Sequence, residues 1–204
     1  MNTSQKVAKQ KENLILLLYK IGAIKFGKFK LKSGKISPYY LDLRFLCSYP
    51  SILKQVAKAY FTNLSAIKHD LIAGIPYTGI PIATAISVIF NERMIYTRKE
   101  AKNHGTTKMI EGVFKPKERV VLIDDVISDG ASKLETIKPL EDEGLVVKDI
   151  IVLLDRGQGG PLVMKQKGYK CYCLADIYDI ISILKKHQKI TSLQVKEAEK
   201  FLAK

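Results

Sequence analysis

The chain has 204 residues, of which 47% are hydrophobic, and this size suits one globular domain with a small appendage. Its apolar runs are too short for a membrane span, and residues 1–6 lack the apolar core of a signal peptide. The formal net charge of +14 would suit nucleic-acid binding, but the lysines are scattered and not interleaved with aromatic residues, which argues against it. Three cysteines without zinc-site spacing favour a reduced, cytoplasmic protein.

In chain order, apolar spacing first predicts a helix over residues 10–22, and glycines and a proline then break residues 23–45 into short extended pieces. Further helices are expected at 51–64, after residues 75–81 as far as about residue 90, and at 132–144, 175–187 and 192–203. Buried strands are expected at 70–74, 94–97, 120–125, 149–154 and 170–174. This alternation predicts an α/β fold with a mostly parallel sheet flanked by helices. We divide the chain into an N-terminal helix and hood (1–45), a core (46–187) and a C-terminal helix (188–204).

The stretch 120–132 carries the clearest functional signal. Val120–Ile123 has the pattern of a buried strand, which Asp124 and Asp125 then end, and a loop of small residues follows. Ser132 and Glu135 have capping-box spacing for the next helix. The loop and the helix N-terminus would hold an anion, whereas the carboxylates would face vicinal hydroxyls or a metal. A ribose 5-phosphate carries both groups; the alternative is a merely polar strand end.

Three other stretches leave two interpretations open. Gly74–Gly79 is a second anion-binding loop or an ordinary connection, and it lacks the Walker pattern. Arg98–Gly105 is rich in cationic side chains and is either a lid that excludes water or a solvated face. Lys32–Arg44 combines cations, aromatic rings and hydroxyls; it either clamps a planar anionic ring or forms a capping hairpin in which Tyr39 or Tyr40 is merely packed.

Together with Leu153–Gly160, these stretches resemble the motifs of type I phosphoribosyltransferases. The strand, acidic pair and small-residue loop are similar to the family's phosphoribosyl pyrophosphate (PRPP) signature. Lys32–Arg44, Arg98–Gly105 and Leu153–Gly160 look like the ribbon, catalytic loop and base-recognition turn of its orotate branch, especially the transferase half of UMP synthase. The resemblance covers residues 10–187. It implies the type I fold with a small N-terminal hood, and Mg²⁺-dependent transfer of phosphoribose from PRPP to orotate.

The resemblance also implies residue roles. Asp124 and Asp125 would hold the ribose hydroxyls and act in catalysis with Lys102 and His104. The residues implied to bind the 5-phosphate are Val126, Ile127, Ser128, Asp129, Gly130, Ala131 and Ser132. Those implied to bind pyrophosphate are Tyr77, Thr78, Arg98, Lys99, Lys102 and His104, and those implied to bind orotate are Lys32, Tyr40, Leu41, Ser128 and Arg156. No residue is assigned as a metal ligand, and Asp129 departs from the small neutral residue that the family has there.

The resemblance implies a homodimer with shared active sites, and a separate orotidine monophosphate decarboxylase is a further candidate partner; nucleic acid and membrane are not expected partners. One alternative is transfer to another base, which the ribbon Lys32–Arg44 disfavours. The other is a PRPP-sensing regulator that binds nucleic acid, which the net charge favours and the lid stretch disfavours. Residues 98–112 lack apolar anchors, so we expect this loop to be mobile without ligand.

Overall fold

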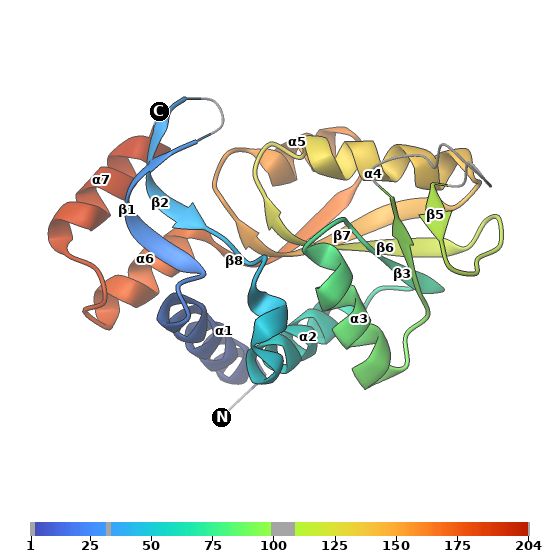
Figure 1. The fold of residues 1–204 in the computed structure, drawn as a ribbon, viewed down its shortest axis with the longest axis horizontal. Helices are drawn as coiled ribbons and strands as arrows, with labels where there is room; N and C mark the ends of the chain where they lie inside the picture. Colours follow the sequence, from blue (N-terminus) through green and yellow to red (C-terminus); the bar gives the residue numbers. More distant parts are fainter. Residues whose placement is uncertain (1–2, 32–33, 99–108, 204) are drawn as a thin grey trace.

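The computed structural model describes residues 3–31, 34–98 and 109–203. Its centre is a six-stranded sheet in the order β5-β4-β3-β6-β7-β8 (Figure 1). The parallel strands are β3 (Leu71–Gly74), β4 (Met94–Thr97), β6 (Arg119–Ile127), β7 (Val146–Asp155) and β8 (Lys170–Asp176), and β5 (Ile110–Glu111) pairs antiparallel with β4. In register, Ala73 lies opposite Leu122, and Leu122 opposite Ile150. The predicted mostly parallel sheet is therefore confirmed, and the carboxyl ends of its parallel strands share one edge.

Helices cover both faces of the sheet (Figure 1). Those on one side are α1 (Thr3–Lys20), α2 (Pro50–Leu64) and α3 (Gly79–Phe90), while α4 (Ala131–Asp142) and α5 (Gly160–Gln166) lie on the other. Pro50 starts α2 in the first turn, where its missing N–H removes no helical hydrogen bond. The chain ends with α6 (Ile177–Lys186) and α7 (Ser192–Leu202). Each face of the sheet has its own apolar cluster, and the larger one joins α1, α2, α3, α6 and α7.

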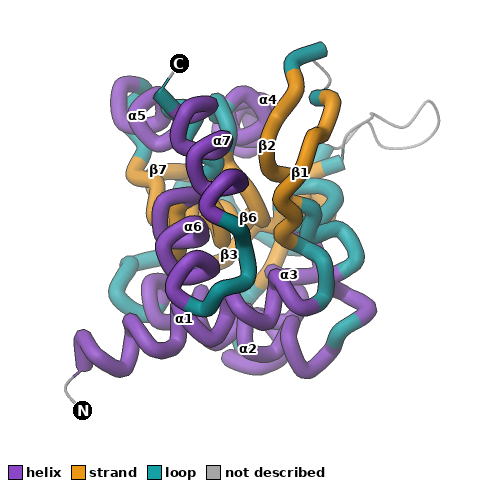
Figure 2. Tube along the Cα trace, turned by 90° about the vertical axis from the view of Figure 1, so that its left-hand side faces the viewer, coloured by secondary structure: helices purple, strands orange, loops and turns teal. Residues whose placement is uncertain are grey.

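The hood is an antiparallel hairpin of β1 (Ile24–Lys30) and β2 (Ile36–Leu41), followed by a short 3-10 helix at Leu46–Ser48. Alternation along β2 buries Tyr39 completely and leaves Tyr40 half-buried. Tyr39 is therefore packed into the apolar core of the hood. Figure 2 shows α7 running beside this hairpin. The hood shares an apolar cluster with the sheet and with α7. The divisions of the chain at residues 45 and 187 stay predictions.

Several local predictions were wrong. The first helix begins at Thr3 and not at residue 10, and β6 continues two residues beyond the acidic pair. The capping box at Ser132 does not form: α4 begins at Ala131, and its N-cap is Gly130, whose φ of 88° is a left-handed value that glycine adopts without a Cβ clash. The short elements α5 and β5 were not predicted. In the part of the chain that the structure describes, no helix is long and apolar enough to cross a bilayer.

Candidate active site

A cavity of about 1200 Å³ opens at the carboxyl edge of the sheet, between the hood and the turns that follow β6 and β7. Its lining includes five residues that the sequence analysis assigned to the site: Tyr40, Leu41, Ser128, Asp129 and Arg156. One lysine of β1 and one of the hairpin turn add positive charge to one side. The structure thus brings the predicted base-binding ribbon, the phosphate turn and the base-recognition turn to one place, which a ligand carrying both a phosphate and an anionic ring could fill.

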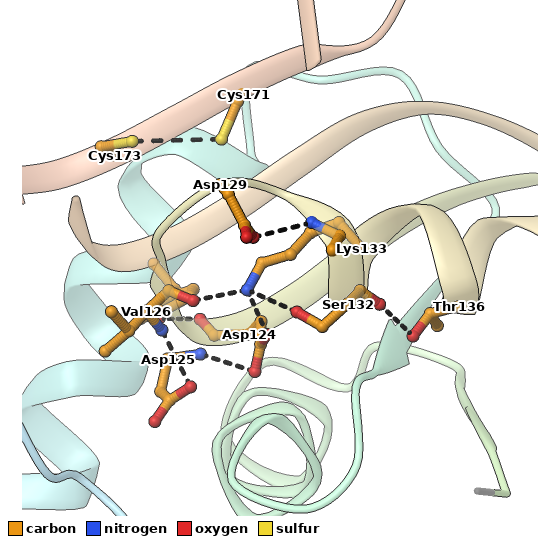
Figure 3. Close-up of polar contacts among 11 residues, drawn as sticks. Asp124, Asp125, Val126, Asp129, Ser132, Lys133, Thr136, Cys171 and Cys173 are labelled. Atoms are coloured by element: carbon orange, nitrogen blue, oxygen red, sulfur yellow. Dashed lines mark hydrogen bonds and ion pairs between the residues drawn. The ribbon is translucent and has the colours of Figure 1, made fainter. Parts of the chain in front are cut away.

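The two aspartates at the end of β6 occupy different environments (Figure 3). Asp124 is only 6% exposed; its Oδ1 accepts a hydrogen bond from the Asp125 N–H (2.9 Å), and its Oδ2 accepts one from the Lys133 ammonium (2.6 Å). Lys133 is 2% exposed and also donates to the Val126 carbonyl and to Ser132 Oγ (3.4 Å). The carboxylate of Asp124 is therefore held inside the protein by Lys133, a residue that the sequence analysis did not single out.

Asp125 is the carboxylate that points away from this ion pair (Figure 3). One of its oxygens accepts the Val126 N–H at 2.8 Å. Burial and, next, the charge of Asp124 raise the pKa of Asp125 to about 7. When ionised, a carboxylate offers acceptor oxygens for two neighbouring hydroxyl donors. Of the acidic pair, Asp125 is consequently the better placed to bind a diol.

The phosphate turn is shorter than predicted. Val126 and Ile127 still belong to β6, where they pair with Leu154 and Asp155 of β7, so the turn proper begins at Ser128. The Ser128 carbonyl accepts the Gly160 N–H at 2.8 Å, which ties the turn to the start of α5.

Asp129, the unexpected acidic residue in this turn, is exposed. Its Oδ1 accepts a hydrogen bond from the Ala131 N–H at 3.1 Å. The side chain therefore satisfies a backbone donor at the start of α4, where a negative charge also meets the positive end of the helix dipole. The structure thus gives Asp129 a backbone partner at the start of α4.

Arg156 lies in the turn after β7 and has buried donors to spare. Within the described part of the chain, its Nε and one terminal nitrogen are buried and have no hydrogen-bond partner. The guanidinium lies over the ring of Tyr39, 5.9 Å from its centroid, and the Tyr39 hydroxyl donates to the Arg156 carbonyl at 2.9 Å. Burial raises the pKa of Tyr39 to about 12, so this hydroxyl keeps its proton. Because unpaired buried donors are costly, the guanidinium is suited to a planar anionic ligand.

The residues assigned to pyrophosphate are only partly described. Tyr77 is 70% exposed in the loop between β3 and α3, and Thr78 precedes the first residue of α3. Arg98 forms an ion pair with Glu111 of β5, so its charge is already engaged within the protein. Lys32, Lys99, Lys102 and His104 lie outside the described residues, as does most of the predicted mobile loop 98–112.

No three His, Cys, Asp or Glu side chains within residues 3–31, 34–98 and 109–203 are grouped so that they could hold a metal ion. Mg²⁺ commonly binds through substrate phosphate oxygens and water, with few protein ligands.

The fold and this site define a phosphoribosyltransferase, and residues 49–181 match the phosphoribosyl transferase domain. Uridine 5'-monophosphate synthase of Bos taurus is 39% identical over 192 residues, which are 93% of this chain and 40% of that protein. Orotate phosphoribosyltransferase of Chlamydia caviae is 35% identical over 196 residues, 95% of this chain and 93% of that one. The chain belongs to the orotate phosphoribosyltransferase family.

Structural similarity extends over nearly the whole chain. The solved structure of Leishmania donovani UMP synthase superposes with a TM-score of 0.84 at 38% identity, covering 99% of this chain and 42% of that one. The chain thus spans about two fifths of the synthases that it matches, and nearly the full length of the Chlamydia enzyme.

Proposed function

We propose that the protein transfers the 5-phosphoribosyl group of PRPP to orotate, giving orotidine 5'-monophosphate and pyrophosphate. The observation that carries this proposal is the cavity in which Arg156, with two buried nitrogens that have no partner among the described residues, faces the same space as the turn after β6. A guanidinium with unsatisfied donors favours an anionic base, and the turn at a helix N-terminus favours a phosphate. Both features support one ligand pair, a sugar phosphate and a planar carboxylate-bearing base.

On the sugar side, Asp125 would accept hydrogen bonds from the ribose hydroxyls, while the turn from Ser128 to Ser132 would bind the 5-phosphate. Asp124 would support this site indirectly. Its carboxylate accepts the Asp125 backbone N–H and is itself neutralised by Lys133. The sugar would be held at both ends, which leaves its anomeric carbon between the base and the leaving group.

On the base side, Tyr40 and Leu41 would border the orotate ring, and Arg156 would pair with its anionic edge. Lys32 would lie between base and pyrophosphate. Orotate arrives as an anion, so its ring nitrogen can attack the anomeric carbon without a strong general base. The protein's main contributions are to align the nucleophile with the carbon–oxygen bond that breaks and to exclude water.

Breaking that bond creates positive charge on the sugar ring and negative charge on the departing pyrophosphate. The cationic loop residues Lys99, Lys102 and His104, with Tyr77 and Thr78 on the facing loop, would stabilise the pyrophosphate. Mg²⁺ bound to the pyrophosphate would supply further positive charge there.

We also infer that two copies of the chain share their sites, and that each copy contributes Lys102 and His104 to the site of the other. We infer further that the reaction takes place in the cytoplasm. A decarboxylase that acts on orotidine 5'-monophosphate is the partner that this product implies.

The test is an assay with orotate, PRPP and Mg²⁺, in which the absorbance of orotate is followed. We expect orotate to disappear only when both PRPP and Mg²⁺ are present, and pyrophosphate to form in equal amount. Adenine, guanine and uracil serve as competing bases. Turnover of one of these without turnover of orotate would overturn the proposed substrate but keep the phosphoribosyl transfer.

A further inference from the structure

We infer that the last turn of α7 forms one wall of the base pocket and positions Arg156, an inference that rests on the proposed function. Phe201 and Leu202 line the same cavity as Tyr40 and Arg156, although they lie far from the predicted motifs in the sequence. Both side chains are only half-buried, so part of each faces the cavity. Two bulky apolar side chains at this position would limit the space beside the base.

The first route from α7 to the arginine passes through Tyr39. The ring of Phe201 meets the ring of Tyr39 edge-on, with centroids 5.8 Å apart and an angle of 89°. Tyr39 is completely buried, its hydroxyl donates to the Arg156 carbonyl, and its ring lies beneath the guanidinium. Edge-to-face aromatic contacts of this kind fix ring orientation. Phe201 therefore helps to hold the surface on which Arg156 rests.

The second route is the close approach of α7 to the turn that carries the arginine. A Cβ placed on Gly157 would lie 2.9 Å from Ile177 Cγ2 and 3.0 Å from Leu202 Cδ2, and Gly157 has a φ of 72°, in the left-handed region. Only a glycine meets both conditions without strain. The chain next to Arg156 thus passes directly under the last turn of α7, and the position of this turn limits where the arginine can lie.

The first turn of α7 keeps this wall in place. Thr191 and Gln194 form a capping box, in which the Thr191 hydroxyl accepts the Gln194 N–H at 3.2 Å and the Gln194 side chain accepts the Thr191 N–H at 2.8 Å. The Gln194 amide also lies 3.4 Å from the carbonyl of Phe26 in the hood. Figure 2 shows the helix alongside the hairpin that these contacts join. The helix is therefore fixed to the hood as well as to the base-recognition turn.

The inference makes a selective kinetic prediction, because the contacts of Phe201 and Leu202 lead to the base side of the cavity and not to Asp125. We expect Phe201→Ala to raise the KM for orotate about tenfold and to leave the KM for PRPP within about twofold of the wild-type value. Leu202→Ala should act in the same direction. Leu193→Ala is the matched control, because Leu193 belongs to the same helix but is 66% exposed.

Two more variants keep the test decisive if Phe201→Ala does not fold, as judged by its thermal melt. Phe201→Leu retains apolar bulk and should raise the KM for orotate less than Leu202→Ala does; Tyr39→Phe removes only the hydroxyl bonded to the Arg156 carbonyl and should raise the same KM. An equal change in both KM values, or values matching those of Leu193→Ala, would overturn the inference. Failure of the wild type to use orotate would instead overturn the proposed substrate, and the comparison would then be made with the base that is used.

Discussion

The Lys133 ammonium lies 2.6 Å from Asp124 Oδ2, and both residues are buried at the carboxyl edge of the sheet. Lys133 belongs to the first turn of α4, whereas Asp124 belongs to β6, so the ion pair joins the two elements on either side of the phosphate turn. The same ammonium reaches the Val126 carbonyl, which fixes the chain immediately before the turn. The position of the turn therefore depends on a charge pair that solvent barely reaches.

Lys133→Met tests this dependence, since it keeps most of the side-chain length and removes the charge. We expect a loss of about 3–5 kcal/mol in the free energy of unfolding, because Asp124 is left as a buried charge without a partner. Urea denaturation measures this loss. Adding Asp124→Asn should restore part of the stability, as the uncompensated charge is then gone. Lys138→Met is the control: Lys138 pairs with Asp142 at 2.7 Å on the exposed face of the same helix, and its loss should change stability little.

Asp125 should make both stability and substrate binding depend on pH. Its pKa is raised from 3.8 to about 7 in the folded protein, so between these values the folded state holds a proton that the unfolded chain has lost. Its contribution to the free energy of unfolding therefore falls as pH rises through this window. The KM for PRPP should fall over the upper part of the same range, because the ionised carboxylate accepts the hydroxyl hydrogen bonds.

The measurement compares the wild type with Asp125→Asn, in urea melts from about pH 4 to about pH 8, so that contributions from other groups cancel. The difference in unfolding free energy between the two proteins should shift with pH across the window. Parallel pH profiles for the two proteins would show that Asp125 does not titrate there.

Gly79→Ala should disturb the site from the side of β3. A Cβ at Gly79 would clash with the Ile123 carbonyl and lie 3.2 Å from the Asp124 Cα, because α3 begins directly against the end of β6. We expect a loss of about 1–3 kcal/mol in stability, as for overpacking in a core, together with a higher KM for PRPP. Gly27→Ala is a suitable comparison, because among the described residues its Cβ would meet only the Phe29 ring, at 3.5 Å. Similar melts for both variants would contradict this account.

Much of the fold was predictable because long apolar periodicities record which faces are buried. The strand at 94–97 was predicted with its observed limits, whereas α5 was missed because it is short and begins at a glycine-rich turn. The motifs around Tyr40, Ser128 and Arg156 could be read from the sequence, and the structure brings them to one cavity, while their roles in binding stay predictions. Lys133 was not predictable, because one lysine among many reveals its partner only when α4 packs against β6. Phe201 and Leu202 likewise reach the cavity through tertiary packing alone.

The homodimer with shared sites, which stays a proposal, can be tested by separating two defects. Lys102→Ala removes a cation that would stabilise the leaving pyrophosphate; Asp125→Asn removes the carboxylate proposed to bind the ribose hydroxyls and leaves the lid sequence intact. Each variant alone should lose about 2–4 kcal/mol of transition-state stabilisation, the amount associated with one lost charged group that binds the substrate. Gel filtration establishes whether each variant is a dimer before the two are mixed.

Mixing the variants and allowing subunits to exchange then shows whether Lys102 acts in the site of its own subunit or in that of the partner. If Lys102 acts on the partner's site, one site of each mixed dimer carries both defects and the other carries neither, so the mixed dimer should regain about half of the wild-type activity of a dimer. If each lid serves its own subunit, every site keeps one defect and mixing restores nothing. Mass spectrometry of differently tagged subunits shows that exchange has taken place. Exchange without recovered activity would therefore rule out the shared site, while recovery requires that a cation from one chain reaches the sugar site of the other.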